Sequence, residues 1–355
     1  WSLAMPTRPE HIFTCGSPVL SCRFHPTEPA LVVGGCQSGQ VVVWDVRAGR
    51  LPVQRSSLAT VAKANSHSHP ICAMELVEGG SGMVTAATDG RLNFWSLANL
   101  RDPAESLMVG ENISSLAVAP EGNAIIVGDE MGSLHTILAS ASAATSKKGT
   151  PSKKISARAG ASKRPIRILG TPAALSETGE EGNNPNHFGM VTAVATRVLP
   201  RNDTTIRAMS RGFLRGSSGL VLSTGVDWTT KLWAPAYTDQ PLLSFLSHSY
   251  DYMCDVQWSP AHPSIFATAS SNGTLGLWNL SSSLDEAMSG TEGIVVDGSS
   301  LNKIKWSADG RRILVASGDK VHALGMSEEV WKVKGDEEAR MMSNLTSRGY
   351  LQADE

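Results

Sequence analysis

Histidine, serine and acidic side chains, which can attack a carbonyl carbon or bind a metal ion, occur throughout this sequence of 355 residues. Their spacing matches none of the motifs that organise such chemistry: the sequence contains no GxxxxGK[ST] phosphate loop, no HExxH and no GxSxG turn. The five cysteines are widely spread and form no CxxC pair, which indicates reduced thiols in a cytosolic protein. We therefore expect no catalytic site, no cofactor and no metal site.

The charge and hydropathy of the chain exclude two further classes of function. A formal net charge of −2 argues against direct nucleic-acid binding and against anionic membrane binding, because both depend on many basic residues. No run approaches the roughly 18 apolar residues that a membrane span requires, so no membrane insertion is expected. The chain begins at Trp1 rather than Met, which suggests a part of a longer protein.

One short pattern returns along the chain: a run of small β-forming residues, a turn with Asp, Asn, Ser or Gly, a second β-forming run and a tryptophan. Four copies end at Trp44, Trp95, Trp233 and Trp278, and two degenerate copies end near residues 137 and 324. Most intervals lie near the roughly 40 to 45 residues of a four-stranded propeller blade. The four tryptophans are therefore expected on equivalent third strands.

This repeat predicts an all-β WD-repeat β-propeller over residues 1–326, with about six four-stranded blades. The triplet Trp1-Ser2-Leu3 repeats Trp95-Ser96-Leu97, so we interpret it as the remnant of a further blade in a seven-bladed full protein. Residues 327–355 are predicted to form a C-terminal tail with a short helix that Asp336 caps.

Three insertions are predicted to be loops. Residues 139–165 are rich in Ala, Ser, Thr, Gly and Lys and contain no acidic residue, which predicts a flexible basic insertion. Nucleic acid, acidic tubulin tails or a kinase could each use this segment, and a solvated insertion between strands also accounts for it. Residues 177–186 are acidic and rich in Asn, and residues 200–216 form a further loop.

The repeat resembles the WD family, in which a turn histidine, a strand Ser or Thr, a turn Asp and the tryptophan form a hydrogen-bonded set across one blade. By that resemblance the set in this chain would consist of His187, Ser223, Asp227 and Trp233. Such a set is structural, because a buried polar group left unpaired costs about 1–3 kcal/mol. His248 occupies the same position of the next repeat, and His67 is a weaker case.

Several strings are more specific than a generic WD pattern. Residues 31–45 read LVVGGCQSGQVVVWD and are followed by PVQR at 52–55. Residues 227–233 read DWTTKLW, and residues 255–263 read DVQWSPAHP. In their order along the chain, these strings resemble the C-terminal propeller of cytoplasmic dynein intermediate chains.

The resemblance implies a non-catalytic subunit of a minus-end-directed microtubule motor, located in the cytoplasm on microtubules. It implies that the propeller binds the dynein heavy chain, which carries the ATPase activity. Dynein light chains and dynactin would bind an N-terminal half that lies outside this sequence. Two other readings stay open: an enzymatic propeller, or another WD-repeat scaffold. Such a scaffold could be an axonemal or ciliary dynein intermediate chain, or an adaptor in ubiquitin transfer or ribosome assembly.

Trp228 and Lys231 are the candidate partner contacts. In a WD blade the turn between the second and third strands lies on one rim, together with the connection to the next blade. The insertions at 139–165 and 200–216 follow a third and a first strand, so both are expected on the other rim. Trp228, which replaces the usual turn Gly, is then expected on the uncluttered rim, with Lys231 near it. The alternative is that Trp228 only covers the neighbouring blade.

Overall fold

The computed structural model describes residues 1–60, 66–120, 122, 124–138, 164–170, 185–197, 219–247, 249–290 and 293–349. Almost all of the 139–165 insertion, most of 177–186 and all of 200–216 lie outside the described residues. The expectations for these three loops therefore stay predictions.

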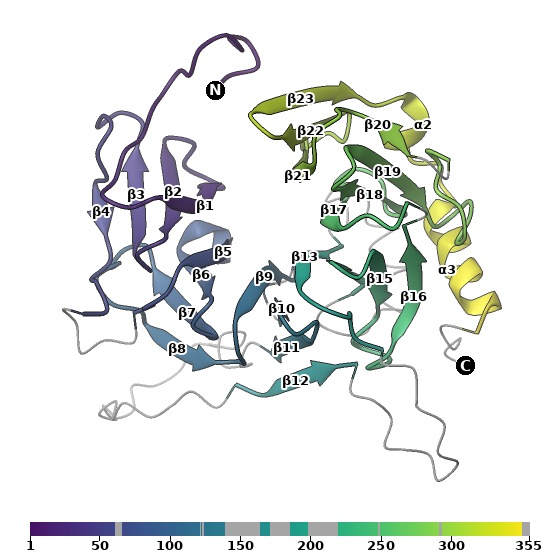
Figure 1. The fold of residues 1–355 in the computed structure, drawn as a ribbon, viewed down its shortest axis with the longest axis horizontal. Helices are drawn as coiled ribbons and strands as arrows, with labels where there is room; N and C mark the ends of the chain where they lie inside the picture. The colour runs from purple at the N-terminus through teal and green to yellow at the C-terminus, as the bar shows by residue number, and fades with distance from the viewer. Residues whose placement is uncertain are drawn as a thin grey trace, which may run out of the picture. The chain divides into compact units, whose positions relative to one another are not determined.

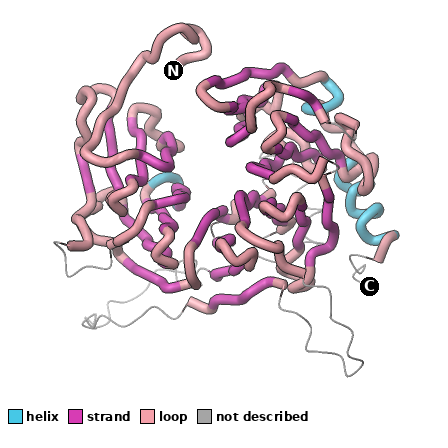
Figure 2. Tube along the Cα trace, viewed as in Figure 1, coloured by secondary structure: helices cyan, strands magenta, loops and turns pink. Residues whose placement is uncertain are grey.

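Strands make up most of the regular structure (Figure 1, Figure 2). The chain divides into two compact units. Unit 1 comprises residues 1–116 and 139–165, and unit 2 comprises residues 117–138 and 166–355. Six small antiparallel sheets form the two units, and in each sheet the strands follow one another in chain order. The predicted fold class, an all-β propeller of six blades, is confirmed.

Unit 1 contains two four-stranded sheets. The first consists of β1 (Val19–Phe24), β2 (Leu31–Cys36), β3 (Val41–Asp45) and β4 (Gln54–Arg55). The second consists of β5 (Ile71–Val77), β6 (Gly82–Ala87), β7 (Arg91–Ser96) and β8 (Glu105–Met108).

Four sheets belong to unit 2, although the first residues of β9 fall in unit 1. They begin with β9 (Ile113–Val118), β10 (Ala124–Asp129), β11 (Leu134–Leu138) and β12 (Ile166–Leu169). The next sheet has β13 (Val191–Thr196), β14 (Val221–Gly225), β15 (Thr229–Trp233) and β16 (Pro241–Leu246). The third has β17 (Met253–Trp258), β18 (Ile265–Ser270), β19 (Thr274–Asn279) and β20 (Ile294–Val295). The last has β21 (Leu301–Trp306), β22 (Arg312–Ser317) and β23 (Lys320–Gly325).

In four of the six sheets the second strand is covered on both faces. β6, β10, β14 and β18 are buried at every position. A strand without an exposed face reads as a continuous run of small and apolar residues instead of an alternation, which explains the sequence repeat. The space beside β2 is narrow, because a Cβ atom at Gly34 would lie 2.6 Å from the ring of Trp44.

Two details differ from the sequence prediction. The last sheet has three strands within the described residues. The chain leaves β23 directly for the helices α2 (Glu328–Trp331) and α3 (Glu337–Ser347), so it supplies no fourth strand there. Trp1-Ser2-Leu3 is not part of a sheet, since Ser2 forms an isolated bridge with Met5.

The C-terminal tail packs on unit 2. Met341, Met342 and Leu345 of α3 belong to the same apolar cluster as Phe245 and Trp258. Asp336 precedes the first turn of α3 but makes no capping hydrogen bond with its side chain. Among the described residues we find no helix with the length and apolar character that a membrane crossing requires.

Candidate functional site

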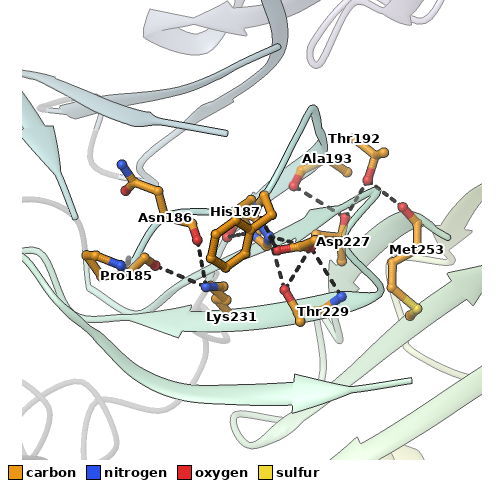
Figure 3. A network of polar contacts seen from close by, with 12 residues as sticks. Pro185, Asn186, His187, Thr192, Ala193, Asp227, Thr229, Lys231 and Met253 are labelled. Atoms are coloured by element: carbon orange, nitrogen blue, oxygen red, sulfur yellow. Dashed lines mark hydrogen bonds and ion pairs between the residues drawn. The ribbon is translucent and has the colours of Figure 1, made fainter. Parts of the chain in front are cut away.

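A network of hydrogen bonds links side chains of the sheet that β13, β14, β15 and β16 form. Figure 3 shows part of this network from close by. His187, in the connection that enters this sheet, places Nδ1 2.9 Å from Oδ1 of Asp227 and Nε2 2.7 Å from Oγ of Ser223. The indole N–H of Trp233 donates to the same Ser223 oxygen over 2.8 Å. The structure therefore brings these four residues into one set.

The protonation of this set follows from its surroundings. Burial lowers the pKa of the His187 imidazole, although Asp227 opposes the shift. Burial alone would raise the pKa of Asp227, but the hydrogen bonds that it accepts, first of all from His187, bring it down to about 2. A neutral His187 then donates from Nδ1 to the Asp227 carboxylate, and its Nε2 accepts the hydroxyl of Ser223.

Ser223, His187 and Asp227 stand in the order of a hydrolase triad, so access decides what they can do. The Ser223 side chain is fully buried and His187 is 1% exposed. The Ser223 oxygen also accepts the Trp233 N–H, so a substrate carbonyl has no route to it. Within the described part of the chain, no group of three or more His, Cys, Asp or Glu could hold a metal ion.

Unit 1 holds a second set of the same kind, which the sequence indicated only weakly. His67 Nε2 lies 2.8 Å from Thr85 Oγ1, and His67 Nδ1 lies 3.2 Å from Asp89 Oδ1. The Trp95 indole donates to Thr85 over 2.8 Å. Its signature was present in the sequence, because Thr85, Asp89 and Trp95 have the same spacing as the residues of the first set.

The other two tryptophans have different partners. Gly34 stands where β14 has Ser223, so the Trp44 indole donates to the backbone carbonyl of Thr14, at 3.3 Å. Trp278 stacks on Phe266 with ring centroids 5.9 Å apart. His248 lies outside the described residues.

The structure corrects the placement of Lys231. This side chain is buried, and its ammonium donates to the backbone carbonyls of Pro185 and Asn186, at 3.0 and 2.9 Å (Figure 3). Burial lowers its pKa, and Asp227 counteracts that effect. Closeness in sequence to Trp228 was misleading, because Lys231 lies inside a strand that has neighbours on both sides.

Trp228 lies at the surface, in the turn between β14 and β15, with a φ of 65° and 40% of its area exposed. Its ring meets the ring of Tyr250, which also has a positive φ, with centroids 5.6 Å apart and the planes at 87°. Phe188 lies beside this turn, because its backbone N–H donates to Asp227 over 3.0 Å. Its side chain is exposed. We call Phe188, Trp228 and Tyr250 the aromatic shelf. Left-handed backbone at two bulky residues is costly and is found mainly at functional sites.

Comparison with known proteins identifies the family. Residues 1–88 match the family model described as dynein axonemal intermediate chain 3 WD40 domain, and residues 239–279 match the WD domain, G-beta repeat. Over 359 aligned residues the chain is 30% identical to the cytoplasmic dynein 1 intermediate chain of Drosophila melanogaster, with 98% of this chain covered. This chain belongs to the dynein intermediate chains.

The alignment covers 46% of the Drosophila protein, so the chain spans about half the length of that relative. The names of the two matches differ: the family model is axonemal and the relative is cytoplasmic. The resemblance seen in the sequence strings is confirmed, whereas the choice between these two classes is a matter of proposal.

One of those dynein intermediate-chain strings, at 255–263, meets the helix α3. Arg197, directly after β13, donates to the carbonyl of Pro263 and to the carboxylate of Glu338, each over 2.7 Å. His262 pairs with the adjacent Glu337, and both pairs are buried. We call Arg197, His262, Glu337 and Glu338 the α3 clasp. It joins the first turn of α3 to two neighbouring sheets of unit 2.

Proposed function

We propose that this chain is the heavy-chain-binding region of a cytoplasmic dynein intermediate chain, acting in the cytoplasm on microtubules. The observation that carries the proposal is the alignment with the Drosophila cytoplasmic protein, which takes in 98% of the chain. Dynein light chains and dynactin would bind the part of the full protein that this chain does not span. The proposal includes no direct contact with nucleic acid and no insertion into a membrane.

The same proposal assigns no catalytic activity to the chain. The serine, histidine and aspartate that stand in triad order are buried and bonded to one another, and the tryptophan closes the set. ATP hydrolysis is assigned to the heavy chain. The purified chain alone is therefore expected to release no phosphate from ATP above the level of a buffer control.

We place the heavy-chain contact on the aromatic shelf. Interface hot spots are enriched in Trp and Tyr, which bury much area at small entropic cost. The Trp228 ring packs against the ring of Tyr250, which lies in the connection to the next sheet. Even so, 40% of Trp228 stays exposed. Lys231 is not part of the proposed contact, because its ammonium already donates to two backbone carbonyls.

A second candidate is an axonemal intermediate chain, which the family model over residues 1–88 favours by its description. Affinity purification of the full-length protein from its own cells separates the two. We expect a cytoplasmic dynein heavy chain in near-stoichiometric amount. An axonemal heavy chain in its place would support the second candidate, and a ubiquitin ligase or ribosome-assembly complex without any heavy chain would overturn both.

A further inference from the structure

Two of the five cysteines lie against each other in unit 1. The Sγ atom of Cys15, which precedes β1, is 3.8 Å from the Sγ atom of Cys36, the last residue of β2. All five cysteines belong to the described part of the chain, and all five are free thiols. We call Cys15 and Cys36 the thiol pair. Neither residue belongs to the aromatic shelf, to the α3 clasp or to a hydrogen-bonded histidine set, so the pair is a separate feature of the molecule.

Backbone hydrogen bonds hold the two segments of the thiol pair side by side. The N–H of Gln37 donates to the carbonyl of Pro18 over 2.8 Å, and the N–H of Ser38 donates to the hydroxyl of Ser17 over 3.0 Å. A disulfide requires the sulfur atoms to approach to about 2.05 Å. Rotation of the Cys15 side chain about its Cα–Cβ bond moves the sulfur atom by an amount of that order. We therefore expect a bond between the sulfurs to form without breaking these backbone contacts.

The two thiols differ in their access to solvent. Cys36 is 1% exposed, and burial raises the pKa of its thiol to about 12, an effect that the neighbouring Cys15 reinforces. Cys15 is partly exposed. A small dissolved oxidant therefore meets Cys15 first, because the thiol that reacts has to be reached from solvent. Cys36 is the thiol that reacts second, from inside the protein.

Hydrogen bonds orient the protons of the thiol pair. The Cys15 thiol donates to the backbone carbonyl of Ser17, with sulfur and oxygen 2.9 Å apart. Its one hydrogen is used there, so Cys36 is the donor in the contact between the two sulfurs and the Cys15 sulfur is the acceptor. The Cys36 hydrogen thus lies beside the sulfur atom from which a leaving group would depart.

We propose that the thiol pair is a redox modification site, at which a peroxide converts Cys15 and Cys36 into an intramolecular disulfide. The thiolate of Cys15 attacks one oxygen of hydrogen peroxide, the O–O bond breaks, and the hydroxide that leaves takes up the proton of Cys15 and becomes water. Cys15 is then a sulfenic acid. The Cys36 sulfur attacks the Cys15 sulfur, the S–O bond breaks, and hydroxide leaves with the Cys36 proton as a second water. Two thiols are oxidised, and one peroxide is reduced to two waters.

The modification is reversible and fastens the segment before β1 to the end of β2. A dithiol reduces the bond by thiol–disulfide exchange and becomes a disulfide itself, so the pair returns to two thiols in a reducing compartment. In the oxidised chain a covalent bond joins segments that the backbone bonds of Gln37 and Ser38 join in the reduced chain. The inference does not depend on heavy-chain binding.

The probe is hydrogen peroxide, added to the reduced and folded full chain, followed by alkylation of the remaining thiols in denaturant and by mass spectrometry of the digested chain. We expect a link between the peptides of Cys15 and Cys36, with the loss of two hydrogen atoms. Its yield should be at least about tenfold above that of any other pairing, because contact gives the two sulfurs a high effective concentration. Dithiothreitol should restore both thiols. Added oxygen at Cys15 with Cys36 still alkylated, a link of either residue to another cysteine, or no oxidation of Cys15 would overturn the proposal.

Two variants test the assignment of the partners. Cys22→Ser is the matched control, because Cys22 is an exposed cysteine of β1. This change should leave the yield of the link unchanged, and its loss would contradict the assignment. Cys36→Ala keeps a small apolar residue at the buried position, and Cys15 should then gain oxygen and form a sulfinic acid in place of a disulfide. An equal yield of disulfide at Cys15 in folded Cys36→Ala would contradict the site, and where this variant does not fold, the peptide map of the unmodified chain decides.

Amide hydrogen exchange tests the structural consequence. The N–H groups of Gln37 and Ser38 should exchange more slowly in the oxidised chain, because the bond between the sulfurs keeps their acceptors in place. The control is the N–H of Thr88, which donates to the carbonyl of Pro70 over 3.2 Å in the next sheet and should exchange at the same rate before and after oxidation. Equal rates at Gln37 in the two chains would contradict the fastening of this segment.

Discussion

The tryptophans that mark the repeat are bonded differently from sheet to sheet. Trp233 and Trp95 donate to buried hydroxyls, whereas Trp44 donates to a backbone carbonyl. We expect Trp233→Ala to lower the free energy of unfolding by about 3–5 kcal/mol, as other large buried aromatic truncations do. Chemical denaturation measures this, with Trp1→Ala, at an exposed position, as the control that should change little. An unchanged denaturation midpoint would show that Trp233 does not have the buried role described.

Trp228 should respond in the opposite way. Its φ of 65° favours glycine, while its ring contributes a contact with Tyr250. Because relief of backbone strain offsets the lost contact, Trp228→Gly is expected to keep the free energy of unfolding within about 1 kcal/mol. Thermal denaturation checks this, and a loss of several kcal/mol would mean that Trp228 is part of the core.

Residues of the repeat motif were easier to predict than the residues between them. Ser223, Asp227 and Trp233 stand at the spacing of the WD repeat, and the same resemblance assigns His187, although it lies 36 and 40 positions before Ser223 and Asp227. Lys231 was misplaced, because its burial depends on carbonyls of a connection more than forty residues earlier in the chain. Long-range partners of this kind leave no local pattern.

At the scale of the elements, the α3 clasp offers a sharp comparison of buried and exposed ion pairs. The side chains of Arg197 and Glu338 are 2% and 9% exposed. Those of Asp336, which precedes α3, and Arg340, which lies in it, are 67% and 50% exposed. Removing one partner of a buried pair leaves a charge without compensation and costs about 3–5 kcal/mol. Glu338→Gln should therefore destabilise the protein by this order.

The control is Arg340→Ala, which breaks the exposed pair and should cost less than about 1 kcal/mol. Equilibrium denaturation of the two variants gives both values. Equal effects would indicate that Arg197 is held by its bond to the Pro263 carbonyl alone. The helix itself was predicted from the sequence, but its ion pair to a residue 141 positions away was not.

At the scale of the whole molecule, buried neutral histidines predict a loss of stability in acid. Burial is the largest cause that lowers the pKa of His262, to about 4, and it also lowers the pKa of His187. Below a pH of about 6.5 these imidazoles bind protons in the unfolded chain but stay neutral in the folded chain, so the free energy of unfolding falls as pH falls.

Glu337 acts with the opposite sign, because burial raises its pKa and its contribution to stability is present at low pH and is lost as pH rises. Because the buried neutral histidines lose stability in acid, the thermal midpoint should fall between pH 7 and pH 4.5. His262→Gln should flatten part of this slope. A midpoint that rises on acidification would contradict the neutral, buried state of His262.

The sequence predicted the six sheets because each blade repeats the same local pattern, which needs no knowledge of distant contacts. It did not predict the three-stranded last sheet, since the degenerate repeat at 313–324 looks like any other up to its third strand.

The most direct test of the proposed function compares three changes in one assay of capture by a dynein heavy-chain tail. Trp228→Gly removes the centre of the aromatic shelf, Tyr237→Ala removes a similarly exposed aromatic ring elsewhere in unit 2, and a deletion removes residues 139–165. We predict that Trp228→Gly weakens the affinity at least about tenfold, as for a hot-spot residue, while the other two stay within about twofold of the unmodified chain. Full capture by Trp228→Gly together with loss of capture after the deletion would contradict the account and move the contact to the insertion.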